Sequence, residues 1–248
     1  LFGVKEDGPI RIAAHELGTI RIKAALQNGK GKEKLSILEA GCGGTPAAFL
    51  FDLCSHYTGV DFSDTGIKSA NKILVNTNMP YSLRESDITN LPFADATFEA
   101  AYSAHVIYHI DEPTGQAKAF AEIMRVLKPS ANAVFILSNP RPFAFPVRAF
   151  KRIVADTPIL SSLANRLRSA PHIPYKPMTL GWMHRELKQY GEVSIICHAI
   201  PSNNFYQNIT EFRGVGKVLW KTILWLQREF PRLSARLGNY VQISVKKF

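Results

Sequence analysis

Cysteines are few in this 248-residue chain, and long apolar runs are absent. The three cysteines, Cys42, Cys54 and Cys197, form no paired framework and lack metal-ligand spacing, which favours a reducing, cytoplasmic environment. No run approaches the roughly 18 consecutive apolar residues of a membrane-spanning helix, and no secretory signal is recognisable. The sequence therefore excludes a disulfide-stapled secreted domain and does not favour an integral membrane protein.

Patterns for metal binding, internal repeats and appended nucleic-acid modules are missing as well. No cluster of histidine, cysteine or aspartate has the spacing of a zinc or magnesium site, so no metal is expected. A chain of this length with 46% hydrophobic residues can bury a sizeable core. These features predict one α/β domain.

Charge is distributed unevenly along the chain. Residues 1–140 hold 13 Lys/Arg and 15 Asp/Glu, a net charge of −2, whereas residues 141–248 hold 17 and 5, a net charge of +12. A strongly basic half indicates an anionic partner: a phosphorylated or carboxylated substrate, an anionic membrane surface, or nucleic acid. A basic surface that only keeps the protein soluble is the alternative.

The most informative segment is Leu35–Pro46, with the sequence LSILEAGCGGTP. It predicts a short buried strand that ends in a tight turn at Gly41 and Gly43, where glycine lets the backbone approach a ligand. Thr45 is the expected N-cap of a following helix, and Pro46 its expected first residue. This order of elements is how a nucleoside-binding βαβ unit begins.

A second predicted strand, residues 56–60, is followed by Asp61, twenty residues after Gly41. A carboxylate at this offset is placed to accept hydrogen bonds from ribose hydroxyls. The dinucleotide fingerprint requires a third glycine where Pro46 stands, which disfavours a pyrophosphate ligand. Glu39, two residues before the first glycine, instead suits a ligand that carries an ammonium group.

The segment 37–45 resembles motif I of class I S-adenosylmethionine-dependent methyltransferases: an acidic residue, one residue, then Gly-x-Gly-x-Gly, with Thr45 replacing the last glycine. The run Arg125–Pro129 is similar to one in the ubiquinone/menaquinone-type, methyltransferase type 11-like group. The resemblance covers about residues 35–138 and the last two strands. Other matching segments follow in order at 60–64 (end of strand two), 85–93 (loop after strand three), 95–103 (strand four) and 133–137 (strand five).

The resemblance implies an α/β, Rossmann-like sheet of seven strands, mostly parallel with an antiparallel last strand, and with helices on both faces. Residues 1–34 are expected to form an N-terminal helical cap, and residues 35–248 the methyltransferase domain. Inserted cap elements are expected after strands five and six, at about 141–178 and 201–239, where this family usually places substrate-recognition elements.

The same resemblance implies S-adenosylmethionine as the cofactor and S-adenosylhomocysteine as its product. The residues that match the family's motifs are expected to surround the methionine part, the ribose and the adenine. They are Glu39, Gly41, Cys42 and Gly43 at the methionine part, with Glu39 favouring its ammonium; Asp61 at the ribose; Phe62, Asp87 and Ile88 at the adenine; and Ser103 at the amino-acid portion.

Methyl transfer from a sulfonium requires an aligned acceptor, and a base where the acceptor is a hydroxyl or an acidic carbon. His105 and His109, at or just beyond the end of strand four, are the candidate bases because the pKa of histidine lies near neutrality. In relatives, a histidine at the position of His109 is often structural. The reserve candidates are Tyr108 and His172, and the candidate acceptor-pocket residues are Phe143, Phe145, Tyr175, Phe205 and Tyr206.

The clearest amphipathic pattern covers about residues 210–230. At about 100° per residue, its basic residues fall in one narrow sector and most apolar residues lie opposite. Such a helix either lies on a membrane surface or packs its apolar face on the domain. The basic sector holds Arg213, Lys217, Lys221 and Arg228, and the apolar side holds Phe212, Val215, Leu219, Ile223, Leu226 and Phe230.

The sequence is therefore interpreted as a methyltransferase for a small-molecule O- or C-acceptor of anionic or lipid-like character. One alternative is the same core acting on RNA or protein through the basic half, which predicts salt-dependent binding to polyanions. The other is a non-catalytic binding module that keeps the cofactor fold. The presence of Glu39, Gly41, Gly43, Asp61 and Asp87 argues against that module.

Overall fold

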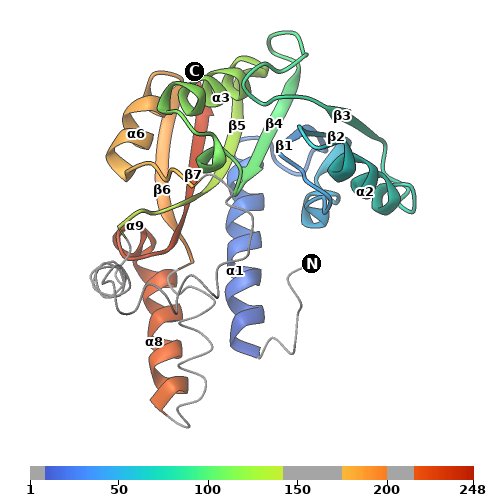
Figure 1. The fold of residues 1–248 in the computed structure, drawn as a ribbon. Coiled ribbons are helices and arrows are strands. Elements are labelled where there is room, and N and C mark those ends of the chain that lie inside the picture. Colours follow the sequence, from blue (N-terminus) through green and yellow to red (C-terminus); the bar gives the residue numbers. More distant parts are fainter. Residues whose placement is uncertain (1–8, 142–174, 200–214) are drawn as a thin grey trace, which may run out of the picture.

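The structure is a computed structural model, and it describes residues 9–141, 175–199 and 215–248. These residues form a seven-stranded sheet in the order β3-β2-β1-β4-β5-β7-β6 (Figure 1). The strands are β1 (Leu35–Ala40), β2 (Cys54–Asp61), β3 (Tyr81–Glu85), β4 (Phe98–Ala104), β5 (Leu127–Ser138), β6 (Gly191–Ala199) and β7 (Tyr240–Lys247).

The strand directions confirm the predicted Rossmann-like α/β sheet. Strands β1 to β5 pair in parallel, and β7 runs antiparallel to both of its neighbours, β5 and β6. The last two strands of the sheet are β6 and β7. Because β2 and β4 flank β1 on opposite sides, the strand order reverses there, and in such sheets ligands bind outside the carboxyl ends of the strands at this point.

Helices cover both faces of the sheet (Figure 1). Successive residues of the central strands enter two separate cores, because side chains alternate across a sheet. Ile37 of β1 shares one core with Leu26, whereas Leu38 shares the other with Phe120. The helical elements are α1 (Pro9–Leu26), η1 (Ala48–Leu50), α2 (Asp64–Leu74), η2 (Ile107–His109), α3 (Pro113–Arg125), α6 (Leu180–Lys188), α8 (Val215–Glu229) and α9 (Pro231–Ala235).

The helix predicted to begin at Thr45 and Pro46 is wrong. Only one 3-10 turn, η1, forms between β1 and β2, and its N-cap residue is Ala47, whose side chain makes no capping hydrogen bond. The crossover is short, since β2 already begins at Cys54, and Leu50 of η1 must reach the core beside the sheet. By contrast, Thr179 caps α6, because its hydroxyl accepts the Trp182 N–H at 3.3 Å.

The predicted cap elements, at about 141–178 and 201–239, lie largely outside the described residues. The described part of the second span contains α8 and α9, which confirms a helix within the predicted 210–230 span. That either span is a cap element stays a prediction. The boundary predicted between residues 1–34 and 35–248 stays a prediction, although α1 packs Ile22 and Leu26 into the core of the sheet. Among the described residues, no helix has the length and apolar content needed to span a bilayer.

Candidate functional site

The turns that follow β1 and β4 meet at Gly41 and Val106. Gly41 has a φ of +82°, and a Cβ at this position would lie 2.2 Å from Cγ2 of Val106. The N–H groups of Gly41 and Cys42 donate to the carbonyl of Val60 at 2.8 and 2.9 Å, which ties the turn to β2. Only glycine fits here, because any side chain would meet both an unfavourable backbone conformation and the β4 loop.

Gly43, two residues later in the same turn, faces open space instead. Its φ is +55°, but no atom of the described residues lies within 4 Å of the Cβ that another residue would place there. Its N–H donates to Oδ2 of Asp61 at 2.8 Å. The turn therefore leaves a gap directly beside the Asp61 carboxylate, as glycine does where a ligand approaches the backbone.

Glu39 is a buried carboxyl group at the end of β1, with 5% of its surface exposed. Its Oε2 accepts hydrogen bonds from the Tyr57 hydroxyl at 2.6 Å and the Ala47 N–H at 3.0 Å, and the described residues donate none to Oε1. Burial raises the pKa of Glu39 to about 7, although these two hydrogen bonds oppose the shift. At neutral pH the group is near its titration point, so a cationic ligand would favour its charged form.

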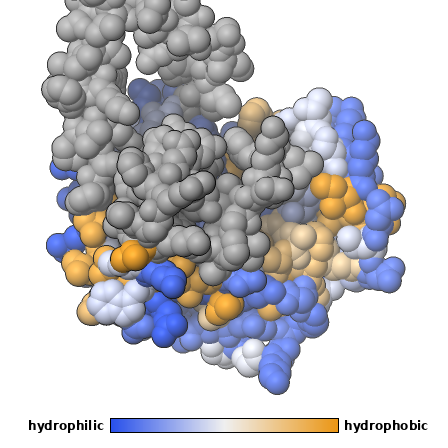
Figure 2. Space-filling view, turned by 90° about the horizontal axis from the view of Figure 1, so that it is seen from below, coloured by the Kyte–Doolittle hydropathy of each residue, from blue (hydrophilic) through white to orange (hydrophobic). Residues whose placement is uncertain are grey.

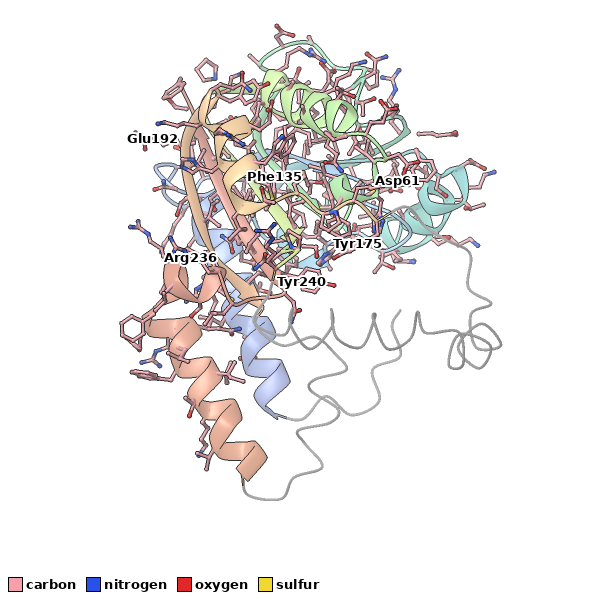
Figure 3. The ribbon with its side chains drawn as sticks, turned by 60° about the vertical axis from the view of Figure 1, so that its left-hand side comes forward. Asp61, Phe135, Tyr175, Glu192, Arg236 and Tyr240 are labelled. Carbon is pink, nitrogen blue, oxygen red and sulfur yellow. The ribbon has the colours of Figure 1, made fainter. Side chains whose placement is uncertain are left out.

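Asp61, the last residue of β2, holds three pieces of backbone together. Besides the Gly43 bond on Oδ2, its Oδ1 accepts the Ser63 N–H at 2.9 Å and its carbonyl accepts the Ser86 N–H at 2.9 Å. The next residue, Phe62, is 80% exposed. A fixed carboxylate thus lies beside an uncovered aromatic ring at the edge of the sheet, next to α2 (Figure 3).

Asp87 and Ile88 lie in the loop after β3 and differ in accessibility. Asp87 is exposed, and its Oδ1 accepts the Thr89 N–H at 2.8 Å, which shapes the loop. Ile88 is 6% exposed and belongs to a core that also holds Val60. The buried Ile88 therefore anchors the loop, and the Asp87 carboxylate is exposed to solvent.

Two other predicted cofactor residues are buried, one within the turn and one in β4. Cys42 is 4% exposed, and burial raises the pKa of its thiol to about 12, so the thiol stays protonated at neutral pH. Ser103 is 1% exposed, and its hydroxyl donates to the carbonyl of Ala40 at 2.8 Å. In this structure the Ser103 side chain joins the ends of β4 and β1.

His105 stands on the β4 side, with a φ of +62° that is uncommon for a residue with a Cβ. Its N–H donates to the Ile136 carbonyl at 3.0 Å, which ties the turn to β5. Its Nδ1 lies 3.0 Å from the Tyr108 hydroxyl, and its ring packs edge-on to Tyr240 with centroids 4.7 Å apart. Loss of water around the ring, and then the proximity of His109, lower the pKa of His105 below its ordinary value.

An aromatic cluster continues from His105 towards residue 175. The rings of Tyr108 and Tyr175 meet edge to face at a centroid distance of 5.4 Å, and the Tyr175 hydroxyl hydrogen-bonds to Ser138. The ring of His109 lies 4.5 Å from that of Tyr108. Figure 3 shows Tyr175 and Tyr240 close together at the end of the sheet. The cluster therefore combines residues from the β4 loop, the end of β5, residue 175 and the start of β7.

The sequence identified His105, Tyr108, His109 and Tyr175, and the structure brings these four side chains together. It missed Tyr240 and Ser138, which face each other in the β5–β7 pairing. Only the antiparallel register puts them side by side, and a single sequence does not reveal that register. The remaining candidates, His172, Phe143, Phe145, Phe205 and Tyr206, lie outside the described residues.

The carboxyl edge of the sheet combines apolar and polar surface. Figure 2 looks onto this end of the molecule and shows hydrophobic surface beside hydrophilic residues on its right-hand side. Within residues 9–141, 175–199 and 215–248, no group of three or more His, Cys, Asp or Glu is placed to hold a metal ion. The described edge thus offers carboxylates, backbone N–H groups, aromatic rings and an imidazole.

Comparisons with known proteins agree with this architecture. Residues 38–135 match the family model of a methyltransferase domain, type 11. The uncharacterized methyltransferase YodH of Bacillus subtilis is 32% identical over 146 residues, which are 57% of this chain and 58% of that protein. The ubiquinone/menaquinone biosynthesis C-methyltransferase UbiE of Desulfotalea psychrophila is 32% identical over 83 residues, 34% of this chain and 32% of that protein.

Likeness to solved structures extends further along the chain. The N-methyltransferase NodS of Bradyrhizobium japonicum, solved with S-adenosylhomocysteine, gives a TM-score of 0.57 at 14% identity and covers 98% of this chain and 89% of its own. At that identity the likeness concerns the fold. The chain spans from about a third to somewhat more than half of the two curated relatives. The family match runs from β1 to β5, and this part of the chain is therefore similar to a methyltransferase domain.

Proposed function

We propose that this protein is an S-adenosylmethionine-dependent methyltransferase that methylates an oxygen or carbon atom of a small-molecule acceptor with anionic or lipid-like character. The observation that carries the proposal is the edge formed by the β1 turn and the end of β2. There the open space at Gly43, the Asp61 carboxylate and the exposed Phe62 ring lie together above the buried Glu39.

The residues of this edge fit each part of the cofactor. Oε1 of Glu39, which the described residues leave without a donor, is available to the methionine ammonium. Asp61 is available to the ribose hydroxyls, and the ring of Phe62 to the adenine. The gap beside Gly43 allows the ligand to approach the backbone. The exposed Asp87 lies in the next loop, where the adenine edge is expected.

When bound, the cofactor supplies an electrophilic methyl group on a positively charged sulfur. The role of this chain is to align the acceptor and to receive a proton where the acceptor is a hydroxyl or an acidic carbon. His105 is the proposed base: its lowered pKa keeps the imidazole neutral at pH 7, and Tyr108 holds its Nδ1. As the acceptor atom forms its bond to the methyl carbon, the bond between that carbon and sulfur would break and leave the sulfur neutral. The acceptor's proton would pass to Nε2 of His105.

The character of the acceptor follows from the surroundings of His105. The neighbouring rings of Tyr108, Tyr175 and Tyr240 favour an apolar or aromatic body. The net charge of +12 over residues 141–248 favours an anionic group. Both features support phosphorylated or carboxylated compounds with a lipid-like part as the first acceptors to screen.

Isothermal titration of the purified chain with S-adenosylmethionine and S-adenosylhomocysteine tests the proposal. Both should bind in about the micromolar range. Asp61→Ala should weaken binding by about 5- to 150-fold, because it removes the ribose partner and frees two backbone N–H groups. Asp64→Ala is the matched control, since Asp64 is an exposed residue that pairs with Lys68 at the start of α2. Absence of binding by the parent chain, or equal affinities of the two variants, would contradict the assignment.

A further inference from the structure

Helix α8 is fixed to the rest of the protein by its inner face and its carboxyl end. Ile223 and Gln227 are buried, one turn apart on the same side. Arg21 of α1 donates to the carbonyl of Gln227 at 2.7 Å, and the hydroxyl of Ser234 in α9 donates to that of Leu226 at 3.0 Å. The helix extends beyond the carboxyl edge of the sheet, beside α1 (Figure 1). Its outer face is therefore held in a defined orientation.

The outer face of α8 and the adjoining α9 exposes large apolar side chains. Trp225 is 54% exposed and Val218 66%. The ring of Phe230, at the junction of the two helices, lies 5.6 Å from that of Trp225. Leu233, one turn into α9, is 59% exposed. Single exposed apolar residues are ordinary, but neighbouring aromatic and aliphatic residues on connected helices form a surface that water solvates poorly.

Exposed basic residues occur on the same two helices or directly after them. Lys221, one turn before Trp225 on α8, is exposed, as are Arg232, beside Leu233 in α9, and Arg236, the C-cap of α9 on the side of the molecule away from Asp61 (Figure 3). No ion pair of these three residues with an acidic side chain occurs among the described residues. Arg228, by contrast, pairs with Glu229 at 2.9 Å. The two helices thus carry exposed basic residues within a few positions of the exposed rings in the sequence.

We propose that this α8–α9 face, formed by Trp225, Phe230, Leu233, Lys221, Arg232 and Arg236, is a docking surface for an anionic lipid bilayer. A tryptophan and a phenylalanine beside basic residues match the boundary between acyl chains and anionic headgroups, where rings insert and cations remain in the headgroup layer. Nucleic acid would use the charges but not the aliphatic Leu233 and Val218. This contact goes beyond the proposed activity and does not depend on it.

Binding to sedimented vesicles provides the test, with the full chain mixed with phosphatidylcholine vesicles that contain or lack phosphatidylglycerol. The chain should partition onto the anionic vesicles only. Lys221→Glu with Arg232→Glu should lower the partition coefficient by more than about 100-fold, since each unit of positive charge contributes about fivefold at an anionic surface and each reversal removes two units. The matched control, Lys72→Glu with Lys118→Glu on α2 and α3, makes the same charge change elsewhere and should have a smaller effect.

The contribution of apolar side chains to binding distinguishes a bilayer from other polyanions. Trp225→Ala should reduce vesicle binding by about tenfold or more, because it removes a large inserting side chain, while binding to poly(U) RNA should be unchanged. Circular dichroism would establish that each variant keeps its fold. Failure of the parent chain to bind anionic vesicles would overturn the proposal, as would equal binding of the Lys221/Arg232 variant and its control. A dimer that Trp225→Ala dissociates would also overturn it, by assigning the face to a second copy.

Discussion

The proposed cofactor side of the sheet's carboxyl edge, at β1 and β2, is held by hydrogen bonds between residues close in the sequence, such as Gly43 with Asp61 and Ala47 with Glu39. The proposed acceptor side, at β4, β5 and β7, joins residues far apart in the chain, such as His105 with Tyr240. The first side carries acidic groups and backbone N–H groups, and the second carries rings, hydroxyls and an imidazole. A charged cofactor and a largely apolar acceptor would need different surroundings of this kind.

The largest expected effect concerns the two glycines of the β1 turn. It tests whether Gly41 is needed for packing and Gly43 for the approach of a ligand. Gly41→Ala should lower the free energy of unfolding by about 3 kcal/mol or more, because the new Cβ would overlap Val106 in a left-handed backbone. Gly43→Ala meets no neighbour among the described residues, and it should cost about 1–2 kcal/mol because of its left-handed φ. Urea unfolding followed by circular dichroism would measure both.

The same two variants sharpen the assignment of the open space. Gly43→Ala should bind S-adenosylhomocysteine at least about tenfold more weakly than the parent chain, since its methyl group occupies the expected ligand space. If Gly43→Ala kept full affinity, the cofactor would not approach this part of the turn. Equal losses of stability in the two variants would contradict the structural difference between the crowded Gly41 and the open Gly43.

The second prediction concerns the charge on the cofactor side. The pKa of Glu39 is about 7 in the folded chain, above its ordinary value of 4.5, so folding favours the protonated group. This contribution to stability is fully present below pH 4.5 and is lost as the pH rises through 7. Glu39→Gln removes the charge, and it should therefore stabilise the cofactor-free chain above pH 7, by about 3 kcal/mol, with little effect below pH 4.5.

Glu99→Gln is the matched control with the opposite sign. Glu99 accepts the Ser36 N–H at 2.9 Å and pairs with Lys128, and its pKa is lowered, first by that backbone hydrogen bond. Its neutralisation should destabilise the chain above pH 4.5. Thermal unfolding across pH 4–8 would compare the two variants. A Glu39→Gln chain that is no more stable at pH 8 than the parent would argue against the burial of a charged carboxyl group.

The contrast between the two sides also explains what the sequence could reveal. Short-range motifs predicted the turn at Gly41 and Gly43 and the strand end at Asp61, because their spacing is set by one βαβ unit. The helix after Pro46 was mispredicted, since capping residues indicate where a helix can start but not whether the crossover has room for one. Tyr240 was missed because only the β5–β7 register brings it to His105.

The α8 segment shows the same limit for surfaces. Helical periodicity predicted a basic sector containing Lys221 and Arg228 and an apolar side containing Ile223, and Ile223 is indeed buried. The periodicity did not single out Trp225, which lies outside both groups and is exposed. Which part of an amphipathic helix meets the protein depends on tertiary anchors, here Arg21 and Ser234, that lie on other helices.

The smallest expected effect tests the acceptor side through the tautomer of His105. A neutral imidazole can take a proton at Nε2 only if its own proton is on Nδ1, where it would donate to the Tyr108 hydroxyl 3.0 Å away. Long-range ¹H–¹⁵N correlation spectra should show a protonated Nδ1 and an unprotonated Nε2 at pH 7. The titration midpoint should lie below 6.5, because the ring is partly desolvated and close to His109.

Tyr108→Phe removes the hydroxyl that orients the imidazole and should change the tautomer population of His105 with little change in stability. Tyr190→Phe, the same substitution between α6 and β6, is the control and should leave the His105 signals unchanged. If the parent chain instead carried the proton on Nε2, the hydroxyl would be the donor to Nδ1, and His105 could not serve as the base. Methyl transfer would then rely on alignment of the acceptor alone, and the aromatic cluster of Tyr108, Tyr175 and Tyr240 would act by positioning it.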